Sequence, residues 1–333
     1  MPLLVHARLR QIFQRGALLS SELNTFPLVS VIVPTYNRAD LLRLTIDSLI
    51  GQAFTDFEIV LVDDGSTDRT REMFAAGCDA RIRYVYQPNG GEASATNHGW
   101  RLARGRYVAV VSSDDPVLPG WMETMVAFME AHPSILVAYP DWRMIDEKGE
   151  TVYSVPGIEY DFARMVAWMQ TIPGPGSFIR KEALAGFGDL RNTKYHYGPD
   201  LDTWYRLALL GDFARVPHEL ACWRSHPTSI SVADRSRARA DEMLVLIRDF
   251  FARPDVPPAI RLLKRYALSR AYWHAAWILI DTHPFISDFY LLRSYWICPG
   301  NPENLPTYLL RNRRPTASHV LRKLRARIRS ALR

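Results

Sequence analysis

The chain has 333 residues, 48% of them hydrophobic, and a formal net charge of +6. This composition excludes a largely disordered chain, and the length allows one large domain with an appendage, or two domains. No apolar run approaches the roughly 20 residues that span a bilayer, no secretion signal is evident in the first 19 residues, and the three cysteines show neither pairing nor zinc spacing. We therefore expect a protein of the cytoplasm.

The positive charge is concentrated at the C-terminus, where residues 304–333 hold nine Lys or Arg and no Asp or Glu. Apolar residues recur there at helical spacing: Leu321, Leu324, Ile328 and Leu332. Residues 316–333 are therefore predicted to form a basic amphipathic helix that contacts an anionic membrane, peripherally and on the inner face of the cytoplasmic membrane. A solvated tail is the alternative. We expect no nucleic-acid partner, because no recognition module accompanies the basic run.

Strand and helix patterns alternate from residue 29 onward. Nearly continuous apolar runs, typical of strands covered on both faces, occupy 29–33, 57–62, 82–86 and 107–111. Helical patterns separate them, and this alternation predicts an α/β fold with a doubly wound, mostly parallel sheet flanked by helices. Further along, the pattern predicts a hairpin over 135–153, a helix over 200–210, two short strands over 213–216 and 220–223, and helices from 233 onward.

Polar loops follow three of the predicted strands, and ligands of parallel sheets bind at such carboxyl ends. The loop Pro34-Thr35-Tyr36-Asn37 is suited to stacking a base, or is an ordinary turn. The pair Asp63-Asp64 is suited to accepting hydrogen bonds from a base or a ribose, although Ser66 or Asp68 could simply cap the next helix.

The third loop, Ser112-Ser113-Asp114-Asp115, suits a hard divalent cation, because Mg²⁺ and Mn²⁺ prefer oxygen ligands. A turn before Pro116 is the alternative reading. The sequence lacks both a P-loop and a Gly-x-Gly-x-x-Gly run after the first strand. Phosphate charge would therefore have to be met by a cation and by backbone groups.

These motifs, in this order, resemble family 2 glycosyltransferases with the GT-A fold, over residues 29–231. The matching elements are Val31 to Asn37, Val62 to Asp68, Asn89-Gly90-Gly91, Asn97-His98-Gly99, and Ala103 to Tyr107 leading into Ser112-Ser113-Asp114-Asp115. The resemblance implies a nucleotide-sugar donor, a divalent metal (Mn²⁺ or Mg²⁺) and inversion at the anomeric carbon.

The resemblance also implies roles for individual residues. The expected nucleotide-binding residues are Pro34, Thr35, Tyr36, Asn37, Asp63, Asp64, Asn97 and Ser112. Asp114 matches the metal-binding Asp of the family's Asp-x-Asp motif, with Asp115 beside it, while Ser112 replaces the first Asp. Asp200 aligns with the catalytic base and is preferred to Asp202, although Pro199 stands where the family usually has Glu. Gly176 and Ser177 are similar to the floor of the sugar site, and Arg224 and His226 to a closing segment that meets the diphosphate.

We thus expect an inverting glycosyltransferase that moves a sugar from a nucleotide-sugar, with UDP-sugars as first candidates, to a glycan or lipid-linked acceptor. The expected domains are a basic arm (1–24), a GT-A domain (25–232), a helical extension (233–303) and a basic tail (304–333). A nucleotidyltransferase is one alternative, but the loop after the first strand lacks the glycines expected for it. A non-catalytic nucleotide-sugar-binding protein is the other, favoured by Ser112 and Pro199.

Overall fold

The computed structural model describes residues 26–74, 79–225 and 234–299. They fall into two compact units. The first contains the described residues up to Met165 and those from Thr171 to 225, and the second contains Val166–Gln170 and the described residues from Asp234 onward. The predicted arm and the predicted basic tail lie outside the described residues.

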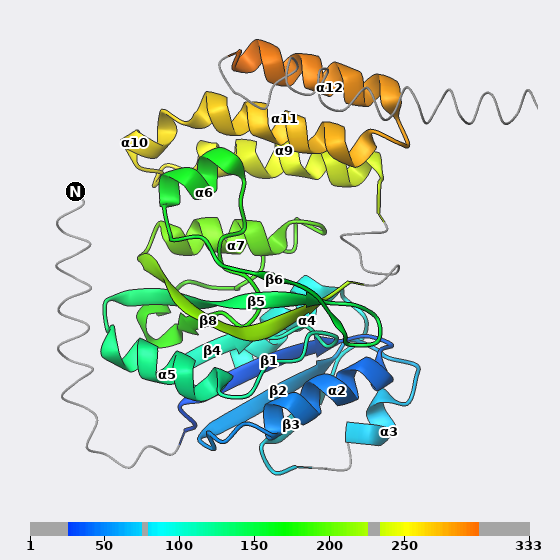
Figure 1. Cartoon of the computed structure of the whole chain (residues 1–333), viewed down its shortest axis with the longest axis vertical. Helices are drawn as coiled ribbons and strands as arrows, with labels where there is room; N and C mark the ends of the chain where they lie inside the picture. The colour runs from blue at the N-terminus through cyan, green and yellow to red at the C-terminus, as the bar shows by residue number, and fades with distance from the viewer. Residues whose placement is uncertain (1–25, 75–78, 226–233, 300–333) are drawn as a thin grey trace, which may run out of the picture. The chain divides into compact units, whose positions relative to one another are not determined.

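The first unit is built on one mixed sheet (Figure 1). Its strands are β1 (Val29–Thr35), β2 (Phe57–Asp63), β3 (Ile82–Tyr86), β4 (Tyr107–Val110), β5 (Ile135–Ile145), β6 (Thr151–Val155), β7 (Phe178–Arg180) and β8 (Asp212–Arg224). The order is β3-β2-β1-β4-β7-β5-β6, with β8 paired to β5. The pairs β1–β2, β1–β4, β2–β3 and β5–β8 are parallel, whereas β7 and β6 run antiparallel to their neighbours.

This arrangement confirms the predicted mostly parallel sheet and the hairpin across β5 and β6. The two short strands expected over 213–216 and 220–223 are instead one strand, β8. Its register against β5 shifts at Pro140 and Asp141, so the strand stays paired across an irregularity that the apolar pattern shows as a break.

Helices cover both faces of the parallel strands. The helices of this unit are α2 (Ala39–Ile50), α3 (Thr70–Phe74), α4 (Glu92–Leu102), α5 (Trp121–Ala131), α6 (Phe162–Trp168, which continues into the second unit), the 3₁₀ helix η1 (Lys181–Leu184) and α7 (Pro199–Ala208). Side chains of α2 and α5 pack on one face against odd-numbered residues of β1 and β2. Ala95 of α4 packs on the other face against Val60 and Val62.

Gly99 lets α4 lie close to the sheet. A Cβ atom at this position would come within 2.4 Å of the Cγ2 atom of Ile32, so any larger residue would push the helix away. The backbone of α4 and the loop before it are therefore held against the carboxyl ends of β1 and β2.

The second unit is helical. Apart from its short segment 166–170, the described part consists of α9 (Arg237–Ala252), α10 (Pro258–Arg261), α11 (Lys264–Leu279) and α12 (Pro284–Ile297). Ser236 caps α9 by accepting a hydrogen bond from the backbone N–H of Arg239 at 3.2 Å. None of the helices described in either unit is long and apolar enough to cross a membrane.

Candidate active site

The parallel strands β1, β2 and β4 end at the same edge of the sheet, and their loops line a cavity of about 410 Å³, called cavity A here. Backbone hydrogen bonds extend the pairing past the strand ends, from Asp64 N–H to Thr35 C=O at 2.9 Å and from Val111 N–H to Ile32 C=O at 2.9 Å. The loops therefore leave the sheet in defined positions.

Part of the first predicted loop lines cavity A. Pro34, Thr35 and Tyr36 are lining residues, and the ring of Tyr36 is 47% exposed at its edge. The hydroxyl of Thr35 is buried and has no hydrogen-bond partner among the described residues. A flat aromatic surface beside an available polar atom suits a heterocyclic base.

Asn37 has another task in this structure. Its backbone is left-handed, with φ at 51°, and its side-chain oxygen accepts a hydrogen bond from Thr67 N–H at 2.7 Å. Its own N–H donates to the hydroxyl of Ser66 at 3.0 Å. Asn37 thus ties the loop after β1 to the loop after β2, and its predicted contact with a nucleotide stays a prediction.

The two acids after β2 point to different places. Asp63 is fully buried, and its carboxylate accepts from Tyr84 Oη at 2.5 Å and from Ser66 N–H at 2.8 Å. Asp64 lines cavity A, and its carboxylate accepts from the N–H groups of Gly90 and Gly91, both at 2.8 Å. The geometry therefore favours Asp64 over Asp63 as the carboxylate that meets a ligand.

Asn97 anchors a distant loop. Its side chain donates to Arg191 C=O at 2.9 Å and accepts from Arg191 N–H at 2.7 Å. The side chain is 2% exposed and does not line cavity A. This geometry favours a structural role over the nucleotide contact expected from the sequence.

The loop after β4 carries the predicted cation ligands. Ser112 and Asp114 line cavity A. Asp114 is paired with Arg38, whose Nη1 lies 2.9 Å from Oδ2, and the side chains are 9% and 33% exposed. A cation at this carboxylate would have to share it with a guanidinium.

Asp115 is oriented differently from Asp114. Its Oδ1 accepts from Arg224 N–H at 2.7 Å. Burial, followed by the neighbouring charge of Asp114, raises the pKa of Asp115 to about 7, against hydrogen bonds from Arg224 N–H and Ser112 that lower it. A carboxyl group in this environment is a poorer ligand for a cation than Asp114.

The donor set fits a cation only together with a substrate. No three His, Cys, Asp or Glu side chains of the described residues form a metal site by themselves. Mg²⁺ is usually held by one or two carboxylates and completed by substrate phosphates. Asp114 and the hydroxyl of Ser112 suit that arrangement, because both line cavity A.

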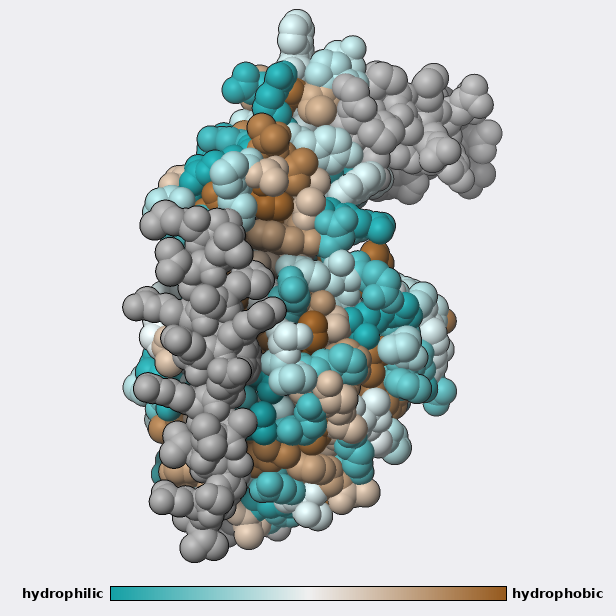
Figure 2. Space-filling view, turned by 90° about the vertical axis from the view of Figure 1, so that its left-hand side faces the viewer, coloured by the Kyte–Doolittle hydropathy of each residue, from teal (hydrophilic) through white to brown (hydrophobic). Residues whose placement is uncertain are grey.

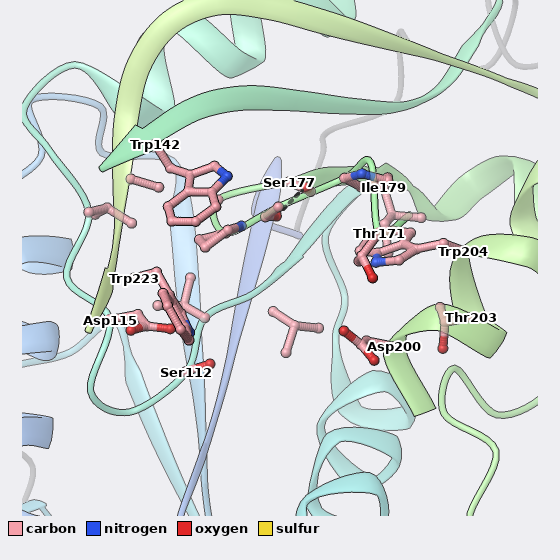
Figure 3. A pocket seen from close by; sticks show the side chains of 18 of the residues that line it. Ser112, Asp115, Trp142, Thr171, Ser177, Ile179, Asp200, Thr203, Trp204 and Trp223 are labelled. Atoms are coloured by element: carbon pink, nitrogen blue, oxygen red, sulfur yellow. Dashed lines mark hydrogen bonds between the residues drawn. The ribbon is translucent and has the colours of Figure 1, made fainter. Parts of the chain in front are cut away.

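A second cavity of about 450 Å³, called cavity B here, adjoins cavity A, and the two share Glu92 and Ser112. Figure 3 shows Asp200 projecting into cavity B from the start of α7, across from Ser112 and Asp115. Three tryptophans also line cavity B: Trp142, Trp204 and Trp223. Carboxylates on one side and indole rings around them suit a sugar, which has hydroxyl groups on its edge and apolar C–H groups on its faces.

The structure separates Asp200 from Asp202. Asp202 is paired with Arg206 one turn later on α7, with Nε and Oδ2 2.7 Å apart, and it does not line cavity B. Asp200 lines the cavity, and Pro199 occupies the first position of α7, where a missing N–H costs nothing. The helix start therefore aims the carboxylate of Asp200 into the cavity.

Gly176 and Ser177 lie where the sequence suggested, in the lining of cavity B. Gly176 has φ at +77°, and a Cβ atom there would come within 2.8 Å of Ala221 Cβ. Its carbonyl accepts from Trp121 Nε1 at 2.8 Å. The glycine is required by both backbone conformation and space.

Arg224 is 3% exposed, and its guanidinium donates to main-chain carbonyls of Asp114, Asp146 and Glu147 at 2.9 to 3.2 Å. This arrangement fixes the loop after β4 and favours a structural role, so the predicted diphosphate contact of Arg224 stays a prediction. His226 lies outside the described residues.

Two arginines at the site were not singled out from the sequence. Arg38 lines cavity A, and Arg191 lines cavity B beside Asp200. The side chain of Arg191 is 11% exposed, and its Nε and Nη1 atoms have no hydrogen-bond partner among the described residues, although Nε lies 3.8 Å from Glu92 Oε1. No motif marks Arg191, because its position depends on the clamp by Asn97 from 94 residues away.

The chain is similar to known proteins over this region. The model of glycosyl transferase family 2 matches residues 30–185. An uncharacterised glycosyltransferase of Rickettsia typhi is 37% identical over 134 residues, which are 40% of this chain and 42% of that protein. Among the first four relatives, all from Rickettsia, the matched segment spans only 20% to 42% of the relative's own length.

Two solved structures show the same fold at low sequence identity. Residues 1–349 of TarS from S. aureus, in complex with UDP-GlcNAc, have a TM-score of 0.62 at 19% identity, over 81% of each chain. The mannosyltransferase PcManGT from Pyrobaculum calidifontis, in complex with GDP-Man and Mn²⁺, has a TM-score of 0.58 at 19% identity, over 96% of this chain and 91% of its own. These likenesses confirm the predicted GT-A architecture.

Proposed function

Since the chain belongs to glycosyl transferase family 2 through residues 30–185, we propose that it transfers a sugar from a nucleotide-sugar donor to a glycan or lipid-linked acceptor, in the synthesis of a surface polysaccharide or glycoconjugate. The observation that carries the proposal is the pair of adjoining cavities, with Asp64 and Asp114 in cavity A and Asp200 in cavity B. The nucleoside diphosphate occupies cavity A, and the transferred sugar and the acceptor hydroxyl occupy cavity B.

Donor binding begins with the base against Tyr36 and with Asp64 accepting a hydrogen bond from the base or ribose. UDP-sugars are the first candidates, and GDP-sugars the next. A divalent cation, Mn²⁺ or Mg²⁺, would be held by Asp114 with the donor phosphates and would neutralise charge on the leaving diphosphate. The guanidinium groups of Arg38 and Arg191 add positive charge along the same path.

Asp200 acts as the general base in a single displacement. Its carboxylate takes the proton of the acceptor hydroxyl while that oxygen forms a bond to the anomeric carbon. The bond from this carbon to the phosphate oxygen breaks at the same time, and its electron pair leaves with the nucleoside diphosphate. Attack from the face opposite the leaving group inverts the anomeric centre.

The proposal is tested by release of nucleoside diphosphate from UDP-GlcNAc and GDP-mannose, with and without Mn²⁺. Asp200→Asn is expected to lower kcat by about 10² to 10⁴ and to leave donor affinity unchanged, because the carboxylate acts on the acceptor. Asp202→Asn is the matched control, since its carboxylate is held by Arg206 outside the cavity. Turnover by Asp200→Asn equal to that of the wild type would reject its role as the base.

A non-catalytic sugar-nucleotide-binding protein is the second candidate. The pairing of Asp114 with Arg38 favours it, together with Ser112 in place of a charged ligand. Calorimetry separates the two functions: a donor that binds in cavity A but is neither hydrolysed nor transferred to any tested glycan or lipid acceptor would support binding alone. We further propose a peripheral cytoplasmic location, with the basic residues 316–333 on the inner membrane face.

A further inference from the structure

Helix α12 exposes more apolar surface than it buries. Its outward residues follow the spacing i, i+4, i+7, i+11 and form what we call the outer stripe: Phe285, Phe289, Leu292 and Trp296, with exposed fractions of 89%, 55%, 45% and 75%. Figure 2 shows that hydrophobic residues reach the surface on one face of the molecule. A surface helix of a soluble protein normally turns such a stripe inward.

The inward face of α12 is partly polar and satisfied by α11. Ser287 donates to Ala276 C=O at 2.8 Å, and Ser269 donates to Ser294 C=O at 2.9 Å. Both serines of α12 are buried. The orientation of the helix is thus specified by hydrogen bonds on its inner side, and the outer stripe is left for a different partner.

A basic groove lies beside the outer stripe. A cavity of about 360 Å³ is lined by Arg248 of α9, Arg293 of α12 and the stripe residue Phe289. Both arginines are exposed, and neither forms an ion pair within the described ranges; Arg248 donates to Tyr272 Oη at 3.0 Å, and Arg293 lies over the Tyr272 ring at 5.9 Å. Asp241 also lines the groove, but its carboxylate already accepts from Tyr290 Oη.

Aromatic and aliphatic side chains beside exposed arginines match the boundary between lipid headgroups and acyl chains. The following residues strengthen this match, since 304–333 add nine positive charges and no negative ones just after α12. A two-fold contact with a second copy suits this surface less well, because it would bring the same arginine pairs together.

We propose that the outer stripe of α12 and the groove of Arg248 and Arg293 dock on an anionic phospholipid bilayer. Phe285 and Trp296 enter the acyl boundary, and the two guanidinium groups bind lipid phosphates. The proposal is independent of the sugar transfer proposed above and concerns a surface separate from the basic tail.

Vesicle flotation of the full chain tests the proposal, with vesicles of phosphatidylcholine alone or mixed with phosphatidylglycerol. Phe285→Ser with Trp296→Ser is expected to lower partition onto the mixed vesicles by about tenfold or more. Arg248→Gln with Arg293→Gln is expected to lower it by about tenfold on the mixed vesicles only. Val152→Ser with Tyr153→Ser is the control, because these residues of β6 are 55% and 50% exposed on the first unit.

Three results would overturn the proposal. Flotation of the stripe variant equal to that of the wild type would leave the basic tail as the whole anchor. A wild-type dimer in light scattering that becomes monomeric in the stripe variant would make the stripe a contact between copies. A melting temperature several degrees lower in the stripe variant would show that another part of the same chain covers the stripe. Donor turnover is measured in parallel, so a failure of the proposed chemistry is seen separately.

Discussion

The ion pair between Arg38 and Asp114 is expected to compete with a divalent cation. Nη1 and Oδ2 lie 2.9 Å apart, which corresponds to about 6 kcal/mol of attraction at an effective dielectric constant of about 20. Desolvation offsets much of this, and the arginine side chain is 33% exposed, so the net coupling lies between that of a surface pair and that of a buried pair, at about 1–3 kcal/mol.

Arg38→Gln removes this competition. The dissociation constant of Mn²⁺ in the absence of nucleotide is expected to fall by about 5- to 150-fold, the equivalent of that coupling. The same variant is expected to bind UDP more weakly in the absence of metal, because cavity A loses a positive charge. Titration calorimetry with Mn²⁺ alone, with UDP alone and with both measures the two effects.

Arg43→Gln is the matched control for this experiment. Arg43 pairs with Asp47 at the same 2.9 Å on α2, but both side chains are exposed and neither lines cavity A. Its loss is expected to leave Mn²⁺ and UDP binding unchanged. An unchanged Mn²⁺ affinity in Arg38→Gln, or an equal gain in Arg43→Gln, would refute the reasoning.

Three further predictions concern the lining of cavity B and the stability of each unit. Arg191→Gln is expected to weaken donor binding by about 10- to 100-fold in calorimetry, because a guanidinium with unused donors lines the cavity; unchanged affinity contradicts this. Gly176→Ala is expected to lower the free energy of unfolding by about 2–4 kcal/mol in urea, and by more than Gly186→Ala, which has a similar φ of +82° but nothing within 4 Å of its Cβ position. Burial, followed by the charge of Arg270, lowers the pKa of His274 from 6.5 to about 4, so its neutral ring favours folding above pH 6.5. About 3 kcal/mol is therefore lost as the pH falls from 6.5 to 4; His274→Gln should flatten this dependence of thermal unfolding, whereas His132→Gln on α5 should not.

The part of the site that could be predicted is the part that sheet geometry assembles. Apolar runs identified β1, β2 and β4, and parallel pairing brings their carboxyl ends to one edge whatever the intervening helices contain. Tyr36, Asp64, Ser112 and Asp114 therefore line one cavity, as the strand-end pattern suggested. Adjacent residues were harder to tell apart, because Asp63 and Asp64 differ only in which side of the strand end they occupy.

The sequence does not identify residues whose positions depend on distant contacts. Asn97 matches a family motif and was assigned to the nucleotide, yet its side chain holds the backbone of Arg191. Arg224 matches a closing segment, yet its guanidinium binds main-chain carbonyls of two loops. In both cases the residue type is suited to either role, and only the folded chain decides which hydrogen-bond partners are within reach.

Helix α12 shows a further limit of periodicity. An apolar stripe at i, i+4, i+7 and i+11 indicates that one face of a helix avoids water, but the pattern is the same whether that face meets protein or lipid. Here the inner face is specified by Ser287 and Ser294, which a polarity count would place outside. Their backbone partners on α11 satisfy them without solvent, so the orientation of α12 follows from hydrogen bonds that only the folded helices create. The exposed stripe is the consequence, and it makes the second unit a binding surface in its own right.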